Sequence, residues 1–388
     1  MKTDNVKIPQ ELAGLRVHVA HDWLTGMRGG EKVLQAILGL FPKARLYTLL
    51  YVKGSVSPFI ENRALESSFI QKLPAASRLY RHYLPLFPLA VRNMKVHDCD
   101  LLISTSHCAI KALQAPTHAR HISYIHSPMR YVWDQYDQYY EQAGPLTRLG
   151  MSAARPWLQK WDVATCSRVD AFIANSDNVA GRINRHYHRL ARVVHPPVDT
   201  GRFAPQKGPK DYCLVVSALV PYKRVDLAIL ACNELKVPLK VVGSGPEEAR
   251  LRAMAGDNIQ FLGWRSDHEL EDIYARAKAL LFPGEEDFGI TPLEAMASGC
   301  PVLALGRGGA LETVRGQDSP SPTGRFFYEQ NTQSLMQAME LLEKDLPHFS
   351  TADMISRAAG FDVTVFKTNL LQALRHSLLY GADGYITY

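Results

Sequence analysis

Two carboxylates eight residues apart are the groups in this sequence best placed to do chemistry. Glu286 lies in an acidic loop that contains glycine, and Glu294 lies in the helix that we expect to follow it. The apolar run before the loop, Ala279–Phe282, predicts a buried strand. In α/β proteins, phosphorylated ligands bind where a strand leads into the N-terminus of a helix. We therefore expect a phosphorylated ligand here, with the two carboxylates facing its hydroxyl groups.

A role in helix capping could account for one of the two carboxylates but not for the other. Thr291, Pro292 and Glu294 fit a capping box, in which Thr291 is the N-cap residue and Glu294 is at N3. Glu286 has no such explanation, although it has acids on both sides and a solvated acidic loop before a helix is the alternative. Glu286 is therefore the stronger candidate for contacting a ligand.

Two cations stand in the sequence where we expect the strand Cys213–Ser217 to lead through a turn into the next helix. Lys223 and Arg224 stand at the predicted helix start, where the helix dipole disfavours positive charge. A bound diphosphate would reverse that effect, because backbone N–H groups and both cations would point at one anion. The alternative is that Asp226 offsets the penalty locally.

A glycine pair stands between the first predicted strand and helix. The pattern predicts a strand over Leu15–Ala20, a loop over His21–Gly30 and a helix over Glu31–Leu40. Gly29 and Gly30 would let the backbone approach a ligand closely. They lack the full spacing of a dinucleotide fingerprint, so plain turn chemistry remains the alternative.

His126 follows the predicted strand Ile122–Ile125 and precedes a loop that contains proline. The carboxyl end of a strand is the usual position of a functional residue in a doubly wound sheet. A satisfied structural histidine is the alternative. The sequence has no nucleophile elbow, Walker loop or H-E-x-x-H helix, which argues against hydrolase, NTPase and zincin functions.

The first half of the chain is basic. Residues 1–200 carry 25 Lys and Arg against 15 Asp and Glu, and residues 201–388 carry 19 against 23. Aromatic, leucine and basic residues alternate within Ser77–Lys95, a pattern typical of a segment at a membrane interface. The alternative is a pair of packed helices with solvated basic ends. The polar N-terminus, scattered cysteines and absence of a long apolar run predict a cytosolic protein.

Strands and helices alternate through both halves, which predicts two parallel doubly wound sheets in an α/β fold. The rhythm breaks at Val194–Asp199, where two prolines predict a stiff linker. We expect an N-terminal domain over residues 1–196, a C-terminal domain over 197–361 and, over 362–388, a terminal helix that returns to the N-terminal domain.

Taken together, these motifs resemble the retaining glycosyltransferases of family 4, with the GT-B architecture of two Rossmann-like domains facing a central cleft. The pattern E-x7-E, formed by Glu286 and Glu294, is the most specific part of the resemblance. The linker, the Val220–Arg224 turn, the Gly29–Glu31 loop and the His126–Tyr131 segment fall in the expected order. The likeness is greatest to bacterial mannosyltransferases of O-antigen and exopolysaccharide assembly.

The resemblance implies a nucleotide-sugar donor bound mainly by the second domain. Catalytic roles are implied for His126 near the reacting sugar, Lys223 at the diphosphate and Glu286 at the transferred sugar. Substrate contacts are implied for Gly29, Gly30, Phe288, Gly289, Ile290 and Glu294, the last of these on the ribose. The family often has an arginine five residues before the lysine, where this chain has Ala218, and Arg224 is a candidate to supply that charge.

The implied reaction transfers mannose from GDP-mannose to a lipid-linked oligosaccharide on the inner membrane face, with an anionic membrane surface as partner. Neither a metal ion nor a cofactor is implied, and no nucleic-acid partner is expected. Three alternatives stay open: a UDP-sugar donor, a nucleotide-sugar epimerase of the same fold, and a nucleotide-binding scaffold without activity.

Overall fold

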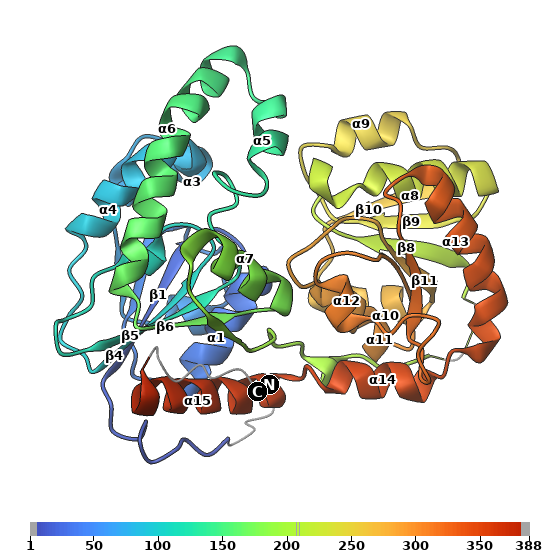
Figure 1. The fold of residues 1–388 in the computed structure, drawn as a ribbon. Coiled ribbons are helices and arrows are strands. Elements are labelled where there is room, and N and C mark those ends of the chain that lie inside the picture. Colours follow the sequence, from blue (N-terminus) through green and yellow to red (C-terminus); the bar gives the residue numbers. More distant parts are fainter. Residues whose placement is uncertain (1–5, 207, 209, 382–388) are drawn as a thin grey trace. The chain divides into compact units, whose positions relative to one another are not determined.

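The structure is a computed structural model that describes residues 6–206, 208 and 210–381. It forms two compact units, Met1–Pro197 with Thr364–Tyr388 and Val198–Val363, here called unit 1 and unit 2 (Figure 1). Residues 1–5 of the predicted N-terminal domain and residues 382–388 of the predicted terminal helix lie outside the described residues. In the part that is described, no helix combines the length and apolarity needed to cross a bilayer.

Unit 1 is built on a seven-stranded parallel sheet with strand order β3-β2-β1-β4-β5-β6-β7. The strands are β1 (Val17–Leu24), β2 (Leu46–Tyr51), β3 (Leu65–Ser67), β4 (Leu101–Ser106), β5 (Arg120–Ile125), β6 (Ala171–Ala174) and β7 (Ala191–Val193). The α-helices are α1 (Gly29–Leu40), α2 (Pro58–Glu61), α3 (Ala76–Leu79), α4 (Phe87–Asn93), α5 (Tyr136–Gln142), α6 (Pro145–Ala164), α7 (Asp177–Tyr187) and α15 (Val363–Tyr380). The 3-10 helices are η1 (Phe69–Lys72), η2 (Tyr80–Leu86), η3 (Ile110–Ala112) and η4 (Thr165–Arg168).

Unit 2 is built on a six-stranded parallel sheet with strand order β10-β9-β8-β11-β12-β13. The strands are β8 (Tyr212–Val216), β9 (Leu239–Val242), β10 (Ile259–Gly263), β11 (Ala277–Phe282), β12 (Val302–Leu305) and β13 (Gly324–Phe327). The helices are α8 (Val225–Leu235), α9 (Glu248–Ala253), α10 (Asp267–Ala275), α11 (Ile290–Ala297), α12 (Ala310–Thr313), α13 (Thr332–Asp345) and α14 (Thr351–Ala359). The 3-10 helices are η5 (Thr200–Arg202), η6 (Pro221–Lys223) and η7 (Leu346–His348).

Both faces of each sheet are buried, which is why the strands read as continuous apolar runs. Along β12, Val302 and Ala304 enter one hydrophobic cluster, and Leu303 and Leu305 enter the cluster on the opposite face. The two parallel sheets with helices between successive strands confirm the predicted α/β class of two doubly wound domains.

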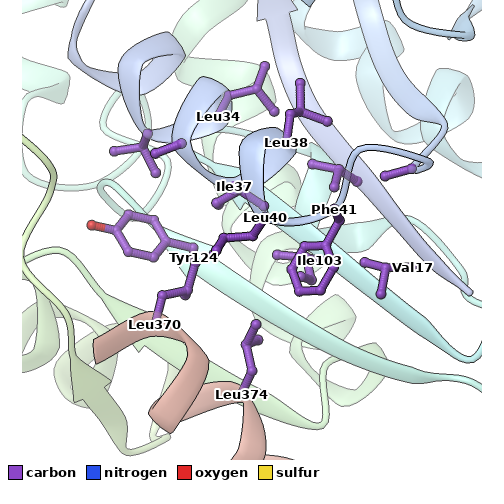
Figure 2. Packing of buried hydrophobic residues seen from close by; sticks show 14 of the residues in the cluster. Val17, Leu34, Ile37, Leu38, Leu40, Phe41, Ile103, Tyr124, Leu370 and Leu374 are labelled. Carbon is purple, nitrogen blue, oxygen red and sulfur yellow. The ribbon is translucent and has the colours of Figure 1, made fainter. Parts of the chain in front are cut away.

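The last helix closes the core of unit 1. Leu370 and Leu374 of α15 pack with Ile37 of α1 and with the strand residues Ile103 and Tyr124 (Figure 2). All five side chains are at most 1% exposed. Residues from opposite ends of the chain therefore share one hydrophobic core.

The structure corrects the predicted bounds of the first strand and the first helix. Strand β1 continues to Leu24, so His21 lies in a buried strand and not in the predicted loop. Helix α1 begins at Gly29, so the glycine pair forms the first turn of the helix. The predicted strand ends too early because the polar residues His21 and Asp22 interrupt the apolar pattern, although both side chains are fully buried.

Candidate functional site

Unit 2 presents several loops at one edge of its sheet, because the carboxyl ends of parallel strands meet there. The loops follow β8, β9, β11 and β12, and they contain several glycines together with the charged residues Lys223 and Glu286 that the sequence singled out. The loop after β11, Pro283–Gly289, is called the acidic loop below. It connects β11 to α11, as the sequence predicts.

Glycines allow these loops to pack backbone against backbone. A Cβ atom on Gly243 would lie 1.9 Å from the carbonyl oxygen of Ser217, and one on Gly245 would lie 2.3 Å from that of Leu219. The Leu219 N–H also donates to the Ser244 carbonyl at 3.0 Å. Close packing of the loops after β8 and β9 thus explains these two glycines without a ligand.

The acidic loop is held from two sides in the same way. A Cβ on Gly284 would lie 2.8 Å from the Cα of Lys223, and one on Gly309 would lie 2.2 Å from the Cα of Phe288. The Gly309 N–H donates to the Glu286 carbonyl at 2.9 Å. The backbone around Glu286 is therefore clamped between the turn after β8 and the loop after β12.

Lys223 and Glu286 form an ion pair. Their side chains are 15% and 21% exposed, so both are largely shielded while still reaching the surface. The structure thus brings together the two unit 2 residues that the sequence predicted to be catalytic. A cation and a carboxylate at the start of α11 could contact a diphosphate and a sugar hydroxyl, respectively.

Arg224 is oriented differently from Lys223. Its backbone has a positive φ of 50°, and it is the N-cap of α8, which begins at Val225. The helix therefore begins two residues after the predicted start near Lys223, and Lys223 lies in the preceding 3-10 helix η6. The Arg224 guanidinium donates to the Asp226 carboxylate through two contacts of 3.2 Å. Asp226 therefore already neutralises much of the charge that Arg224 was expected to offer a ligand.

The capping box predicted at Thr291 is wrong. Helix α11 starts at Ile290 with Gly289 as N-cap, and the φ of +91° at Gly289 favours glycine over other residues. Glu294 therefore lies beyond the N3 position, and its carboxylate accepts a hydrogen bond from the Tyr274 hydroxyl at 3.0 Å. Phe288 buries its ring in the unit 2 core, so only its backbone could serve a ligand.

In unit 1, His126 follows β5 directly, as predicted. Its backbone N–H donates to the Ser106 carbonyl at 2.8 Å. Among the described residues, the buried Nε2 atom of its ring has no hydrogen-bond partner. Burial of the ring, together with the nearby imidazoles of His107 and His21, holds the pKa of His126 well below its ordinary value. At neutral pH this side chain is an uncharged imidazole that could exchange hydrogen bonds with a hydroxyl group.

Gly30 approaches His126 closely. A Cβ on Gly30 would lie 3.6 Å from Nε2 of His126 and 3.5 Å from Cε1 of His21. The rings of His21 and His126 are 6.3 Å apart and nearly perpendicular. The sequence reasoning missed His21, and its place near the carboxyl end of the first strand was the available signal.

Comparison with known proteins assigns both units to one group of enzymes. Residues 27–202 match the family model "Glycosyltransferase Family 4", and residues 199–359 match "Glycosyl transferases group 1". The chain belongs to the group 1/family 4 glycosyltransferase superfamily.

Relatives with named activities match part of this glycosyltransferase-family chain. The GDP-mannose-dependent alpha-(1-6)-phosphatidylinositol monomannoside mannosyltransferase of Mycolicibacterium smegmatis is 36% identical over 149 residues, which is 31% of this chain and 39% of that protein. The chain spans about two fifths of the length of the curated relatives that it matches first.

Solved structures resemble the chain over nearly its whole length. Sucrose-phosphate synthase from Thermosynechococcus elongatus has a TM-score of 0.70 at 17% identity, covering 94% of this chain and all of that one. Anabaena HepE in complex with UDP and glucose has a TM-score of 0.68 at 18% identity, covering 93% and 99%. At these identities the likeness shows the shared GT-B fold.

Within unit 2 the structure joins Lys223 to Glu286, and within unit 1 it joins Gly30 to His126. That both groups face one donor molecule stays a prediction from the family resemblance.

Proposed function

We propose that this protein is a retaining glycosyltransferase that moves mannose from GDP-mannose to a lipid-linked saccharide. The ion pair between Lys223 and Glu286, clamped at the start of α11, carries the proposal. A relative whose name states GDP-mannose dependence and a lipid-borne mannoside acceptor supports the donor and the acceptor class.

The roles in unit 2 follow from charge. Breaking the bond between sugar and diphosphate develops negative charge on the leaving phosphate and positive charge on the anomeric carbon. Lys223 and the N–H groups at the start of α11 stabilise the phosphate, which is usually the largest catalytic contribution. Glu286 binds a hydroxyl of the transferred sugar, and Glu294 binds the ribose.

From unit 1, His126 meets the reacting sugar, and Gly29 and Gly30 meet the diphosphate. Neutral His126 suits this role because an uncharged imidazole exchanges hydrogen bonds with hydroxyl groups without attracting the anionic phosphate. Retention of configuration follows the family, with the acceptor attacking the face from which the phosphate leaves. No side chain need then act as a covalent nucleophile.

A UDP-sugar is the second candidate donor, because HepE, which shares the fold, was crystallised with UDP and glucose. Thermal unfolding with GDP-mannose, UDP-glucose and UDP-galactose separates the donors, since a bound ligand raises the melting temperature according to its concentration over Kd. The nucleotide sugar that stabilises the protein is then tested for transfer to a lipid-linked acceptor.

The site is tested with Lys223→Met and Glu286→Gln, which should each lower transfer at least about a hundredfold if the charges act on the transition state. Lys278→Met is the matched control, because Lys278 also forms an ion pair in unit 2, with Glu343, away from the loops. Normal transfer by either folded site variant would refute the assignment. Interconversion of the free nucleotide sugar without acceptor would instead indicate an epimerase, and binding without turnover a scaffold.

An anionic membrane is the proposed location of the acceptor, and helix α6 supports it. Leu146, Leu149 and Trp157 lie along one side of α6 at helical spacing and are 88%, 71% and 49% exposed. Such large apolar side chains are unusual on a surface that contacts only water. We therefore propose that this side of α6 dips into the lipid headgroups.

The charges next to α6 fit an anionic surface. Residues 67–97 contain five Lys and Arg and no Asp or Glu, and residues 145–161 contain three and none. The two stretches share one hydrophobic cluster, to which Phe87 and Leu158 belong, so they are adjacent in unit 1. Clustered cations beside exposed apolar side chains are typical of peripheral binding to anionic lipid.

Co-sedimentation with phosphatidylglycerol vesicles at low salt tests the membrane. The Leu146→Ser/Leu149→Ser variant should bind such vesicles at least about tenfold more weakly than the wild type, since full burial of each apolar side chain contributes about 1.5–3 kcal/mol and burial among headgroups a part of that. Leu311→Ser, which changes a 54% exposed leucine of unit 2, should bind as the wild type does. Equal binding by both variants, or no binding by the wild type, would rule out this surface.

A further inference from the structure

A buried tyrosine hydroxyl holds the carboxylate of Glu294. Tyr274 lies near the end of α10, its side chain is fully buried, and its hydroxyl donates to Oε2 of Glu294 at 3.0 Å. Glu294 on α11 is only 5% exposed. A buried tyrosine needs a partner for its hydroxyl, and this one has a charged group of the candidate donor site.

The ring of Tyr274 is itself held firmly. It belongs to the main hydrophobic cluster of unit 2 and meets the Phe203 ring nearly at right angles, with centroids 5.8 Å apart. Burial, and then the negative charge of Glu294, raise the pKa of the Tyr274 hydroxyl well above its ordinary value. The hydroxyl therefore stays protonated at neutral pH and remains a donor to the carboxylate.

A glutamate carboxylate needs such a contact to keep a fixed orientation. The terminal torsion of glutamate is broad, so the plane of the carboxylate rotates unless a hydrogen bond sets it. Two neighbouring hydroxyls of a ribose can donate to the two oxygens of one carboxylate only when that plane faces them. A donor behind the carboxylate that occupies one lone pair of Oε2 would orient it in this way.

We propose that Tyr274 is a positioning residue that orients the Glu294 carboxylate for the 2′- and 3′-hydroxyls of the donor's ribose. The inference rests on the proposed function, in which Glu294 contacts that ribose. It adds that recognition of the ribose depends on a side chain that touches no ligand. Removing the tyrosine hydroxyl should then weaken binding of a ribonucleotide more than binding of its 2′-deoxy analogue, which keeps one of the two hydroxyls.

Calorimetric titration of the whole protein with GDP and with 2′-deoxy-GDP tests this. If the donor screen favours UDP, the uridine pair is used in their place. The wild type should prefer the ribonucleotide. Tyr274→Phe should weaken GDP binding about three- to tenfold, the effect of one hydrogen bond, and should weaken the binding of 2′-deoxy-GDP, which keeps only the 3′-hydroxyl, to a clearly smaller extent.

Tyr212 supplies a matched control. It lies in the same cluster and is 5% exposed, and its hydroxyl donates to the Ile273 carbonyl at 2.8 Å and not to Glu294. Tyr212→Phe likewise removes one hydrogen bond of a buried tyrosine, so it should lower the melting temperature while the ratio of the two nucleotide affinities stays as in the wild type.

Two results would overturn the inference. One is a Tyr274→Phe protein with the wild-type affinity ratio, and the other is one in which both nucleotides weaken equally. Glu294→Asp is a second variant, because its shorter side chain withdraws the carboxylate from Tyr274. It should also reduce the ratio of the affinity for GDP to that for 2′-deoxy-GDP. If Glu294→Gln leaves GDP binding intact, the ribose assignment of the proposed function fails. If only Tyr274→Phe is silent, the positioning role alone fails.

Discussion

Gly309→Ala tests whether the loops of unit 2 are clamped as tightly as the structure indicates. The new Cβ would lie 2.2 Å from the Cα and 2.5 Å from the carbonyl oxygen of Phe288. Carbon atoms pack at about 3.5 Å or more, so the two backbones must separate by about 1.3 Å (3.5 − 2.2). Both are backbone atoms, so no flexible side chain can relieve the contact.

The cost can be estimated from two contributions. Overpacking a dense site costs about 1–3 kcal/mol, and the separation also lengthens the bond from Gly309 N–H to the Glu286 carbonyl, worth about 1 kcal/mol. Gly309 has a helical φ of −65° and ψ of −14°, so alanine is not strained by its backbone. We expect a free energy of unfolding lower by about 2–4 kcal/mol and a weakened donor affinity.

Thermal unfolding and nucleotide-sugar titration measure the two effects. Gly201→Ala is the control, because a Cβ there meets no atom within 4 Å and the glycine has no positive φ. That substitution should leave stability unchanged or raise it by about 0.4–1 kcal/mol through the unfolded state. If Gly309→Ala melts and binds donor as Gly201→Ala does, the backbone contact is not tight, and the clamped acidic loop is wrong.

Three further predictions concern charge. Lys111 and Asp162 form a fully buried ion pair, in which Nζ lies 3.0 Å from the carboxylate. Lys111→Met leaves the buried carboxylate without its cation, so it should lower the free energy of unfolding in urea by about 3–5 kcal/mol, and Lys111→Met/Asp162→Asn should restore part of that loss. Burial lowers the pKa of His121 to about 4, so below about pH 6.5 the unfolded state binds a proton that the native state does not. Stability should therefore fall between pH 6.5 and 4, with a smaller slope in His121→Gln. Arg224→Gln should weaken nucleotide-sugar affinity less than Lys223→Met does, because Asp226 already engages the guanidinium.

Much of the fold was readable from sequence, because parallel strands buried on both faces leave long apolar runs between helical patterns. The strands on which the site depends, β5, β8 and β11, were found in this way. Strands β3, β7 and β13 were missed, because they are three or four residues long and carry partly exposed side chains. Strand β2 (Leu46–Tyr51) was missed too, although it is six residues long and buried over its first five. Short edge strands take their conformation from the neighbour they pair with, and a local pattern does not record that neighbour.

The local chemistry of the site was only partly readable. The sequence predicted that Glu286 and Lys223 contact a ligand, but it could not show that they pair with each other. It assigned Glu294 to a capping box because threonine and proline favour helix starts, whereas the positive φ of Gly289 sets the start two residues earlier. Propensities describe average helices, and here a glycine conformation overrides them.

The sequence by itself determined the class of fold, the family and the residue types at the candidate site, because these depend on periodicity and on motifs short enough to be read along the chain. Only the tertiary structure decided which groups meet. Tyr274 reaches Glu294, Gly309 reaches Phe288 and Gly30 reaches His126 through contacts between separate elements. Such contacts arise when helices and loops pack on a sheet, so no spacing along the chain encodes them.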